Sequence, residues 1–302
     1  MSDRIFSPGK LLLTSEYVVL DGALALAVPT KKGQSFCFKE IDDSQSLLYW
    51  QAYHEEQLWL NVCLNYRTFQ ILETNLPEAA AFIVKVIGIL KELSTAKLHS
   101  NNSYHIKTNL EFPSDFGWGS SSTLMNNLAE WADVDPFQLN DIALGGSGYD
   151  IAVAMEKSAV LFQIQEGKRN VEKIQFSPLF KDDLLLIHLN RKQDSRQAIQ
   201  HYRSQEKPKH LIAEFTSITK AVLECNNLEN FSHLMLVHEQ QLSDFLQIPP
   251  VKEIYFKNCP SFVKSLGGWG GDFVMASKFE GYQAWFSERG FFTIFTFTDV
   301  ID

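Results

Sequence analysis

The sequence predicts an α+β protein with two domains, and three observations support this. The chain has 302 residues, and single domains commonly have about 100–200. The first third carries short apolar and alternating runs that are typical of strands, whereas helical spacing dominates from about residue 194 to residue 258. The pattern changes close to Phe176, so residues 1–175 are expected to form one domain and residues 176–302 the other.

The first domain is expected to begin with strands. Asp21-Gly22 is a turn signal between two apolar runs, at residues 11–20 and 23–28. Further strands are expected at residues 35–41, 46–52, 58–64 and 68–72. Pro77 then begins an amphipathic helix.

The rest of this domain alternates between the two types of element. Residues 104–110 alternate apolar and polar side chains, as a half-buried strand does. Leu124, Leu128 and Trp131 mark one face of a following helix. Two short helices are expected around residues 145–150, and then a strand at residues 159–165.

The second domain is expected to combine a strand, several helices and a mixed end. Its expected elements are a strand at 184–189, helices within 194–258, strands at 262–266 and 273–277, a helix at 282–289 and a strand at 291–297.

Composition excludes several classes of protein. The formal net charge is −9 and no concentrated basic cluster occurs, so nucleic acid is not an expected partner. The longest apolar segment, residues 79–90, contains Lys85 and is too short to span a bilayer, so no membrane partner is expected. The four cysteines show no CxxC pair or metal-ligand spacing. A cytoplasmic protein with reduced thiols is therefore expected.

A loop rich in glycine and serine lies between the strand at 104–110 and the next helix. It reads PSDFGWGSSST over residues 113–123. Glycines let a ligand approach the backbone, and the N–H groups at the start of a helix favour an anion. The alternative is a helix N-cap after a flexible turn, but four consecutive hydroxyl residues exceed what a cap needs. The loop lacks the GxxxxGK[ST] pattern of a Walker A motif.

Three other segments carry chemistry-bearing residues. Lys10 follows Pro8-Gly9 and enters an apolar run, so its charge could serve a phosphoryl group or simply face water. Residues 267–271 hold four glycines, which suit either a hairpin or close approach of a ligand. Asp150 follows a glycine cluster at an expected helix start, where it could act on a helix dipole, as a general base or as a metal ligand.

In order and spacing, these segments resemble motifs of the GHMP kinase superfamily. Residues 7–22 resemble its first motif, 113–123 its second, 146–150 the segment of its catalytic aspartate, and 264–272 its third, glycine-rich motif. The resemblance implies an amino-terminal domain like ribosomal protein S5 domain 2 and a ferredoxin-like carboxy-terminal domain. It also implies an ATP- and Mg²⁺-dependent kinase for a small anionic acceptor, with mevalonate or phosphomevalonate as the best candidates, acting as a monomer or homodimer.

The resemblance assigns roles to individual positions. Asp150 and Lys10 would be catalytic, and Ser121 and Asp150 would hold Mg²⁺. ATP would be bound by Gly117, Trp118, Gly119, Ser120, Ser121 and Ser122. The acceptor would be bound by Glu16, Tyr17, Gly268 and Gly270.

Several departures from the family pattern leave other functions open. Trp118 stands where the family usually has leucine, and Trp269 interrupts the third motif. No clear counterpart exists for a glutamate that helps to hold Mg²⁺ in mevalonate kinases; Glu130, Asp135 and Asp141 are candidates. A nucleotide- or metabolite-binding protein without catalysis is therefore an alternative, as is a relative of diphosphomevalonate decarboxylase. A further basic segment at residues 191–196 could meet an anionic substrate or form a solvated helix start.

Overall fold

A computed structural model describes residues 3–191, 195–269 and 271–301, with the side chains of residues 195–197 left out. The chain divides into two compact units, each made of several stretches. Unit 1 comprises residues 1–9, 32–114 and 119–157, and unit 2 comprises residues 10–31, 115–118 and 158–302. The domain boundary predicted between residues 175 and 176 stays a prediction.

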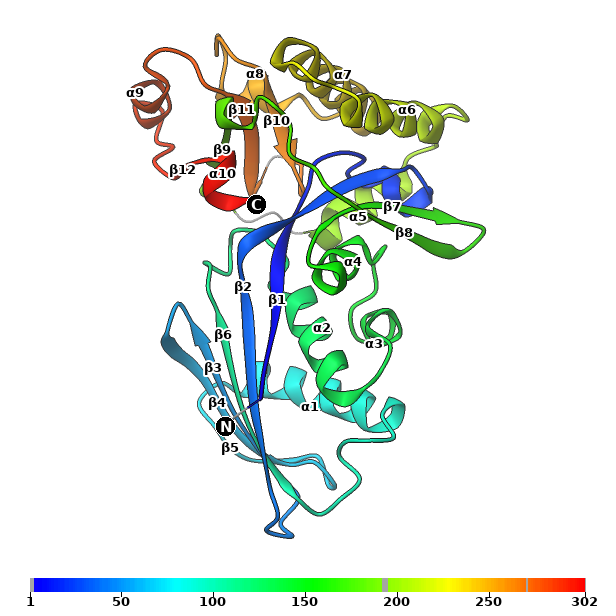
Figure 1. Cartoon of the computed structure of the whole chain (residues 1–302), viewed down its shortest axis with the longest axis vertical. Helices are drawn as coiled ribbons and strands as arrows, with labels where there is room; N and C mark the ends of the chain where they lie inside the picture. Colours follow the sequence, from blue (N-terminus) through cyan, green and yellow to red (C-terminus); the bar gives the residue numbers. More distant parts are fainter. Residues whose placement is uncertain (1–2, 192–194, 270, 302) are drawn as a thin grey trace. The chain divides into compact units, whose positions relative to one another are not determined.

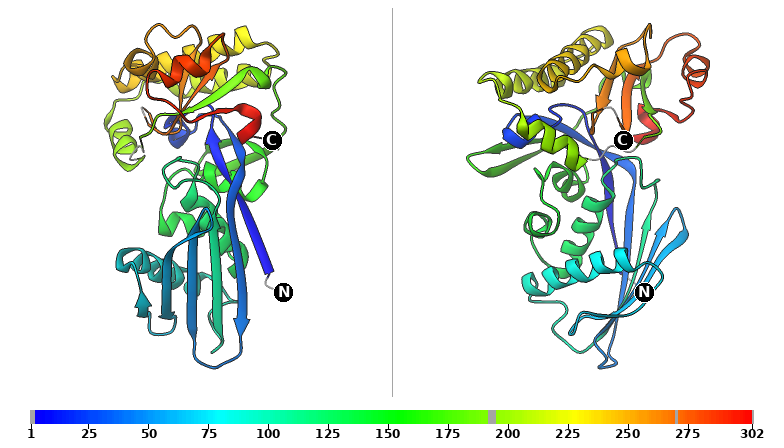
Figure 2. Two further views of the ribbon diagram at one scale, coloured as in Figure 1. Left: turned by 90° about the vertical axis from the view of Figure 1, so that its left-hand side faces the viewer. Right: turned by 180° about the vertical axis from the view of Figure 1, so that it is seen from behind.

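Unit 1 is a sheet with helices on one face, as Figure 1 and Figure 2 show. Its strand order is β5-β4-β3-β6-β2, and β1 pairs with β2. The strands are β1 (Asp3–Leu12), β2 (Ala25–Ile41), β3 (Leu47–His54), β4 (Gln57–Asn65), β5 (Gln70–Thr74) and β6 (Ser103–Leu110). The helices are α1 (Pro77–Leu93), α2 (Ser120–Ala132), α3 (Pro136–Ala143) and α4 (Tyr149–Glu156).

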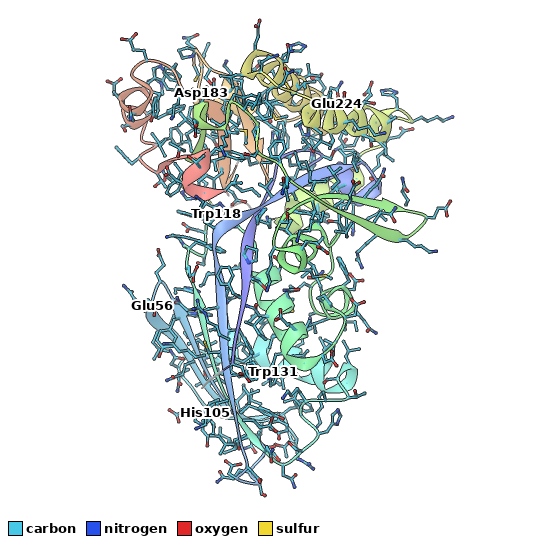
Figure 3. All side chains as sticks on the ribbon, in the orientation of Figure 1. Glu56, His105, Trp118, Trp131, Asp183 and Glu224 are labelled. Carbon is cyan, nitrogen blue, oxygen red and sulfur yellow. The ribbon has the colours of Figure 1, made fainter. Side chains whose placement is uncertain are left out.

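The core of unit 1 lies between the sheet and its helices. Trp131 on α2, labelled in Figure 3, packs against Phe36, Phe38 and Tyr104 of the sheet at ring-centroid distances of 5.3–6.3 Å. Burying such aromatic rings contributes more apolar area per residue than any other side chain, so this cluster is a large part of the hydrophobic stabilisation of the unit.

Unit 2 contains a four-stranded antiparallel sheet in the order β10-β11-β9-β12. Its strands are β7 (Ala159–Gln165), β8 (Lys168–Ile174), β9 (Leu184–His188), β10 (Val263–Leu266), β11 (Phe273–Ser277) and β12 (Ile294–Thr296). Its α-helices are α5 (Ser195–Ser204), α6 (Leu211–Leu223), α7 (Leu228–Leu246), α8 (Val251–Tyr255), α9 (Tyr282–Ser287) and α10 (Phe297–Val300), and short 3₁₀ turns cover Val18–Asp21 and Lys181–Asp183. β7 pairs with β8 and with residues 25–27 of β2, and α7 packs on β10.

The apolar run at residues 11–20 is not the strand that we predicted. β1 ends at Leu12, and the following segment contains Ser15 at φ 65° and Tyr17 at φ 62°. Positive φ values are incompatible with an extended strand. The run is apolar because it is buried, and its conformation is set by partners far away in the sequence.

Three further differences concern strands. Residues 23–28 and 35–41 belong to one strand, β2, because its first part pairs with β7 and its last part with β6. The sequence does not predict β8, because this strand has few apolar residues. The Glu166-Gly167 turn, where both φ values are positive, connects it to β7 as a hairpin. The predicted strand at 291–297 is only β12, followed directly by α10.

No helix within residues 3–191, 195–269 and 271–301 is long and apolar enough to cross a membrane.

Candidate active site

Lys10 is held near the end of β1 by the loop that leads to α2. Its backbone N–H donates to the Trp118 carbonyl at 2.9 Å. Its ammonium Nζ donates to the Gly117 carbonyl at 2.8 Å. The Lys10 side chain, for which the sequence left a phosphoryl group or water as the partner, therefore contacts the predicted phosphate loop directly, and this hydrogen bond restrains its ammonium.

The same loop packs tightly against Asp272 at the start of β11. A Cβ atom added at Gly117 would stand 2.3 Å from Asp272 Oδ2, closer than such atoms approach. Asp272 is anchored in turn: its N–H donates to the Arg191 carbonyl and its carbonyl accepts from the Leu189 N–H, both at 2.8 Å. Gly117 is thus required by the carboxylate of Asp272, the last residue of the third motif, to which the sequence assigned no role.

The backbone of Trp118 is part of the predicted ATP loop, whereas its ring belongs to the core of unit 2. The ring is buried and stacks on Phe273 at a centroid distance of 5.5 Å, with Phe116 edge-on at 5.0 Å. The departure from leucine is explained by this aromatic packing, which fastens residues 115–118 to unit 2. A role of Trp118 in binding ATP stays a prediction.

In unit 1, α2 begins without a side-chain cap. Its N-cap is Gly119, at φ 81°. The nearby hydroxyls bond to carbonyls instead: Ser122 Oγ donates to the Gly119 carbonyl at 2.8 Å, and Thr123 Oγ1 donates to the Ser120 carbonyl at 2.9 Å. The first-turn N–H groups and the positive end of the helix dipole therefore remain suited to an anion. Ser121 is exposed beside them.

A buried polar network fixes α2 on the strands beneath it. Asn127 accepts from Ser7 Oγ at 2.7 Å and donates from Nδ2 to the Gln34 carbonyl at 2.9 Å. Asn126 Nδ2 donates to Ser7 Oγ at 2.8 Å, and Thr123 Oγ1 to Gln34 Oε1 at 2.9 Å. Sequence reasoning missed these residues. The signal was an Asn-Asn pair within an otherwise apolar helix face, since buried polar side chains need partners.

Asp150 lies in the first turn of α4, again after a glycine N-cap. Gly148 has φ 92° and no side chain caps the helix. The Asp150 side chain is partly buried, and Oδ1 accepts from the Ile151 N–H at 3.1 Å. α4 packs on α2, where Asn126 Nδ2 donates to the Ala154 carbonyl at 3.4 Å. The positive end of the helix dipole interacts favourably with a carboxylate at this place, and a carboxylate can act as a general base or a metal ligand.

Binding of Mg²⁺ by Ser121 and Asp150 stays a prediction. Mg²⁺ takes hard oxygen ligands, usually one or two carboxylates plus phosphates and water, and the hydroxyl of Ser121 and the carboxylate of Asp150 are groups of this type. No group of three or more His, Cys, Asp or Glu side chains that could hold a metal ion lies within the described residues. Two candidates for an additional ligand have other partners: Glu130 lies 3.9 Å from Lys157 Nζ, and Asp135 caps α3.

The glycine-rich segment connects β10 and β11 as a hairpin, and Tyr17 holds it. The Trp269 N–H donates to the Tyr17 hydroxyl at 2.8 Å, and both side chains are buried in one apolar cluster. Gly268 is half-buried. Gly270, the other glycine predicted to bind the acceptor, lies outside the described residues, as do residues 192–194 of the further basic segment. Arg191 donates to the Tyr255 hydroxyl at 2.8 Å.

Glu16 lies in the interior of unit 2, where it is 1% exposed. Lys264 Nζ donates to its Oε1, and His238 Nε2 lies 3.2 Å from its Oε2. Burial raises the pKa of Glu16, although the Lys264 charge opposes this. Burial and the same charge hold the pKa of His238 well below its ordinary value. The imidazole is therefore neutral at pH 7, which agrees with its accepting a hydrogen bond from the Ser15 N–H at 2.8 Å.

Glu239 follows His238 in α7, and it makes the free energy of unfolding depend on pH. Burial raises its pKa from 4.5 to about 7. A carboxyl whose pKa is raised by folding stabilises the protein below its unfolded pKa, and this contribution is lost as the pH rises through the folded value. Between pH 5 and pH 8 the free energy of unfolding of the wild type is expected to fall by about 3 kcal/mol more than that of Glu239→Gln. Urea titrations at a series of pH values measure both.

The slope against pH is the informative quantity, because the hydrogen-bond acceptor lost in Glu239→Gln lowers stability by a similar amount at every pH. Glu253→Gln, which removes an exposed carboxylate of α8, should follow the wild type. Parallel slopes for the wild type and Glu239→Gln would show that Glu239 titrates normally.

Neither a protein-family model nor a curated protein matches the chain. Solved structures do. The phosphomevalonate kinase of Streptococcus pneumoniae, in complex with phosphomevalonate and AMPPNP, has a TM-score of 0.71 and 15% identity, covering 97% of this chain and 99% of that one. The mevalonate kinase of Methanococcus jannaschii has a TM-score of 0.65 and 15% identity, covering 98% and 97%. The galactokinase of Lactococcus lactis, complexed with galactose, has a TM-score of 0.67 and 15% identity, covering 96% and 89%.

The chain has the GHMP kinase fold. The similarity extends over nearly the whole chain, so the predicted fold class and the resemblance are confirmed. Within this fold, unit 2 brings Lys10 to Gly117, and Tyr17 to the glycine-rich hairpin. Unit 1 holds Ser120–Ser122 and Asp150 at the starts of two helices that pack together. The roles predicted for these residues stay predictions.

Proposed function

We propose that the protein is an ATP-dependent kinase that phosphorylates a small anionic acceptor, with mevalonate and phosphomevalonate as the first candidates. One observation carries the proposal: the ammonium of Lys10 bonds to the loop that leads into the uncapped start of α2. A fixed cation and a helix start that favours phosphate both suit phosphoryl transfer, because its catalysis is mostly positioning and charge stabilisation.

Each residue then has a definite role. The first-turn N–H groups of α2 bind nucleotide phosphates, and Lys10 neutralises charge that develops on the transferred group. Asp150 orients the acceptor hydroxyl and takes its proton as the new P–O bond forms and the bond to ADP breaks. Ser121 and Asp150 would hold Mg²⁺, which, when bound, neutralises charge on the nucleotide phosphates.

The acceptor is proposed from two similarities. The matched structures include a mevalonate kinase, a phosphomevalonate kinase in complex with phosphomevalonate, and a galactokinase. The first and third motifs of the sequence also resemble those of mevalonate- and phosphomevalonate-type enzymes. We propose a small-molecule partner only; a cytoplasmic location and a monomer or homodimer remain our expectations.

ADP release with Mg·ATP and a panel of acceptors tests this function. Mevalonate, phosphomevalonate, homoserine and simple sugars are compared, and mass spectrometry identifies the phosphorylated product. Turnover of about 1–100 s⁻¹ is expected with one anionic acceptor. ATP binding without turnover of any acceptor would contradict the proposed acceptor class, and absence of ATP binding would contradict the phosphate-binding role of the loop at residues 115–122.

A second candidate function is nucleotide binding without catalysis. It is favoured by the engagement of Glu130 and Asp135 elsewhere, which leaves Mg²⁺ with few carboxylate ligands. This case would be identified by two results together: nucleotide affinity that does not change when Asp150 loses its charge, and no phosphorylation of any acceptor in the panel.

A further inference from the structure

Four ionisable side chains form a buried cluster in unit 2, which we call the Lys264 cluster. Its members are Lys264 on β10, Glu16 in the loop after β1, and His238 and Glu239 on α7. Each is at most 2% exposed. Charged residues are almost never buried to this extent without a specific reason.

The first half of the cluster connects β10 to the loop after β1. Lys264 Nζ donates to Glu16 Oε1 and, at 2.6 Å, to the Ser265 carbonyl. Glu16 therefore has an internal counter-charge 248 residues away in the sequence. His238 accepts from the Ser15 N–H and so fixes the backbone next to Glu16.

The second half ties α7 to the strand that precedes the glycine-rich hairpin. Glu239 Oε2 accepts from the Ser265 N–H at 3.0 Å, and Oε1 accepts from Ser265 Oγ at 3.1 Å and from the Val251 N–H at 3.3 Å. These hydrogen bonds connect Glu239 to Ser265 in β10 and to Val251, the first residue of α8. α7 therefore fixes the strand that leads into the hairpin.

The cluster thus joins two of the segments that we propose to form the active site. The loop after β1 continues from Lys10, and the hairpin after β10 contains Trp269 and Asp272. Two contacts of the hairpin lead back to the same region: Trp269 N–H donates to Tyr17, and Asp272 packs on Gly117, whose carbonyl accepts from Lys10. A shift of Glu16 relative to Lys264 would therefore move both the hairpin and the surroundings of Lys10.

Stabilisation of the fold alone would not require the charges of Lys264 and Glu16 at this buried place. Replacing a buried ion pair by apolar residues of similar volume is often neutral or stabilising, whereas a single unpaired charge is costly. The geometry therefore points to orientation: an ion pair with further hydrogen bonds has one arrangement, while an apolar contact tolerates several.

We propose that Lys264 and Glu16 are positioning residues: their buried ion pair fixes the loop after β1 and the glycine-rich hairpin against each other, and thereby the acceptor site. The proposal deepens the function proposed above and rests on it. It also gives Glu16 an indirect part in acceptor binding, in place of the direct contact that its motif implies.

The test is the double variant Glu16→Gln/Lys264→Met, which removes both charges of the ion pair and leaves Glu239, whose pKa burial already raises, as the remaining buried carboxyl of the cluster. The folded enzyme is expected to bind an ATP analogue within about threefold of wild type while kcat/KM for the acceptor falls about ten- to a hundredfold, as for a small misplacement of reacting groups. Lys97→Met/Glu40→Gln removes a partly exposed ion pair of unit 1 and should change neither quantity. A double variant that loses melting temperature but keeps kcat and KM per folded molecule would overturn the proposal.

Two additions keep the outcome decisive. If the double variant does not fold, Tyr17→Phe, which removes only the hydroxyl bonded to Trp269, should raise the acceptor KM several-fold and speed amide exchange at residues 266–273. If the wild type phosphorylates no acceptor, the proposed function fails, and hydrogen exchange decides the positioning role separately. Exchange in the Glu16→Gln/Lys264→Met variant should then rise at residues 13–17 and 264–273 alone, and unchanged exchange there would overturn the positioning role.

Discussion

Replacing Asp150 with asparagine is expected to lower kcat about 10³-fold while nucleotide affinity stays within about threefold of the wild type. Asparagine has nearly the same shape and can still accept from the Ile151 N–H through its amide oxygen. It has no charge, however, and cannot take a proton, and general-base catalysis contributes about 10²–10⁴-fold. Steady-state ADP release measures kcat, and calorimetry with a non-hydrolysable ATP analogue measures affinity.

Asp133→Asn is the matched control for this prediction. Asp133 is an exposed residue of the same unit, at the end of α2, with φ 54°, a conformation that asparagine adopts readily. The control should leave kcat and stability close to those of the wild type. If Asp150→Asn kept more than a tenth of the wild-type kcat, Asp150 would not be the group that takes the acceptor proton.

The parts of the site that the sequence predicts are those in which local residues decide the backbone. Gly117, Gly119 and Gly148 all have positive φ, and each lies at or just before a helix start. Glycine is the residue that enters such conformations without steric cost, so its spacing in the sequence reports the loop geometry directly. Asp150 and Ser121 follow from their places after these glycines.

The parts that the sequence does not predict depend on distant partners. The run at residues 11–20 looks like a strand, but Ser15 bonds to a histidine 223 residues away and takes a positive φ. Lys264 sits on a strand whose four residues are all buried, and its counter-charge is contributed by a loop near the start of the chain. A hydrophobicity pattern cannot reveal such pairs, because the pairing is made by the tertiary fold.

Trp118 shows an intermediate case. The sequence identifies it as a departure within the second motif, and the structure supplies the reason in the aromatic rings of Phe116 and Phe273. A pattern can mark the position, but only packing tells whether a large side chain there faces a ligand or a core.

Replacing Gly117 with alanine is expected to cost about 3 kcal/mol of stability and to lower kcat/KM at least about tenfold. The new Cβ would stand 2.3 Å from Asp272 Oδ2, so the loop or the carboxylate must move. Overpacking of this kind costs about 1–3 kcal/mol, and a non-glycine residue at φ 67° adds about 1 kcal/mol. Because the Gly117 carbonyl accepts from Lys10 Nζ, moving the loop also displaces the ammonium. Urea unfolding and ADP release measure the two effects.

Gly281→Ala separates backbone strain from collision. Gly281 has φ 73°, yet an added Cβ would meet nothing within 4 Å. The Gly281→Ala variant should therefore lose only about 1 kcal/mol of stability and keep its activity.

The collision itself is tested by the double variant Gly117→Ala/Asp272→Gly, which removes the obstructing side chain. Its loss of stability should be smaller than the sum of the losses of the two single variants by about 1–2 kcal/mol, as coupled neighbours show. Strict additivity, or a loss at Gly281 as large as at Gly117, would mean that the Asp272 carboxylate does not fix this loop.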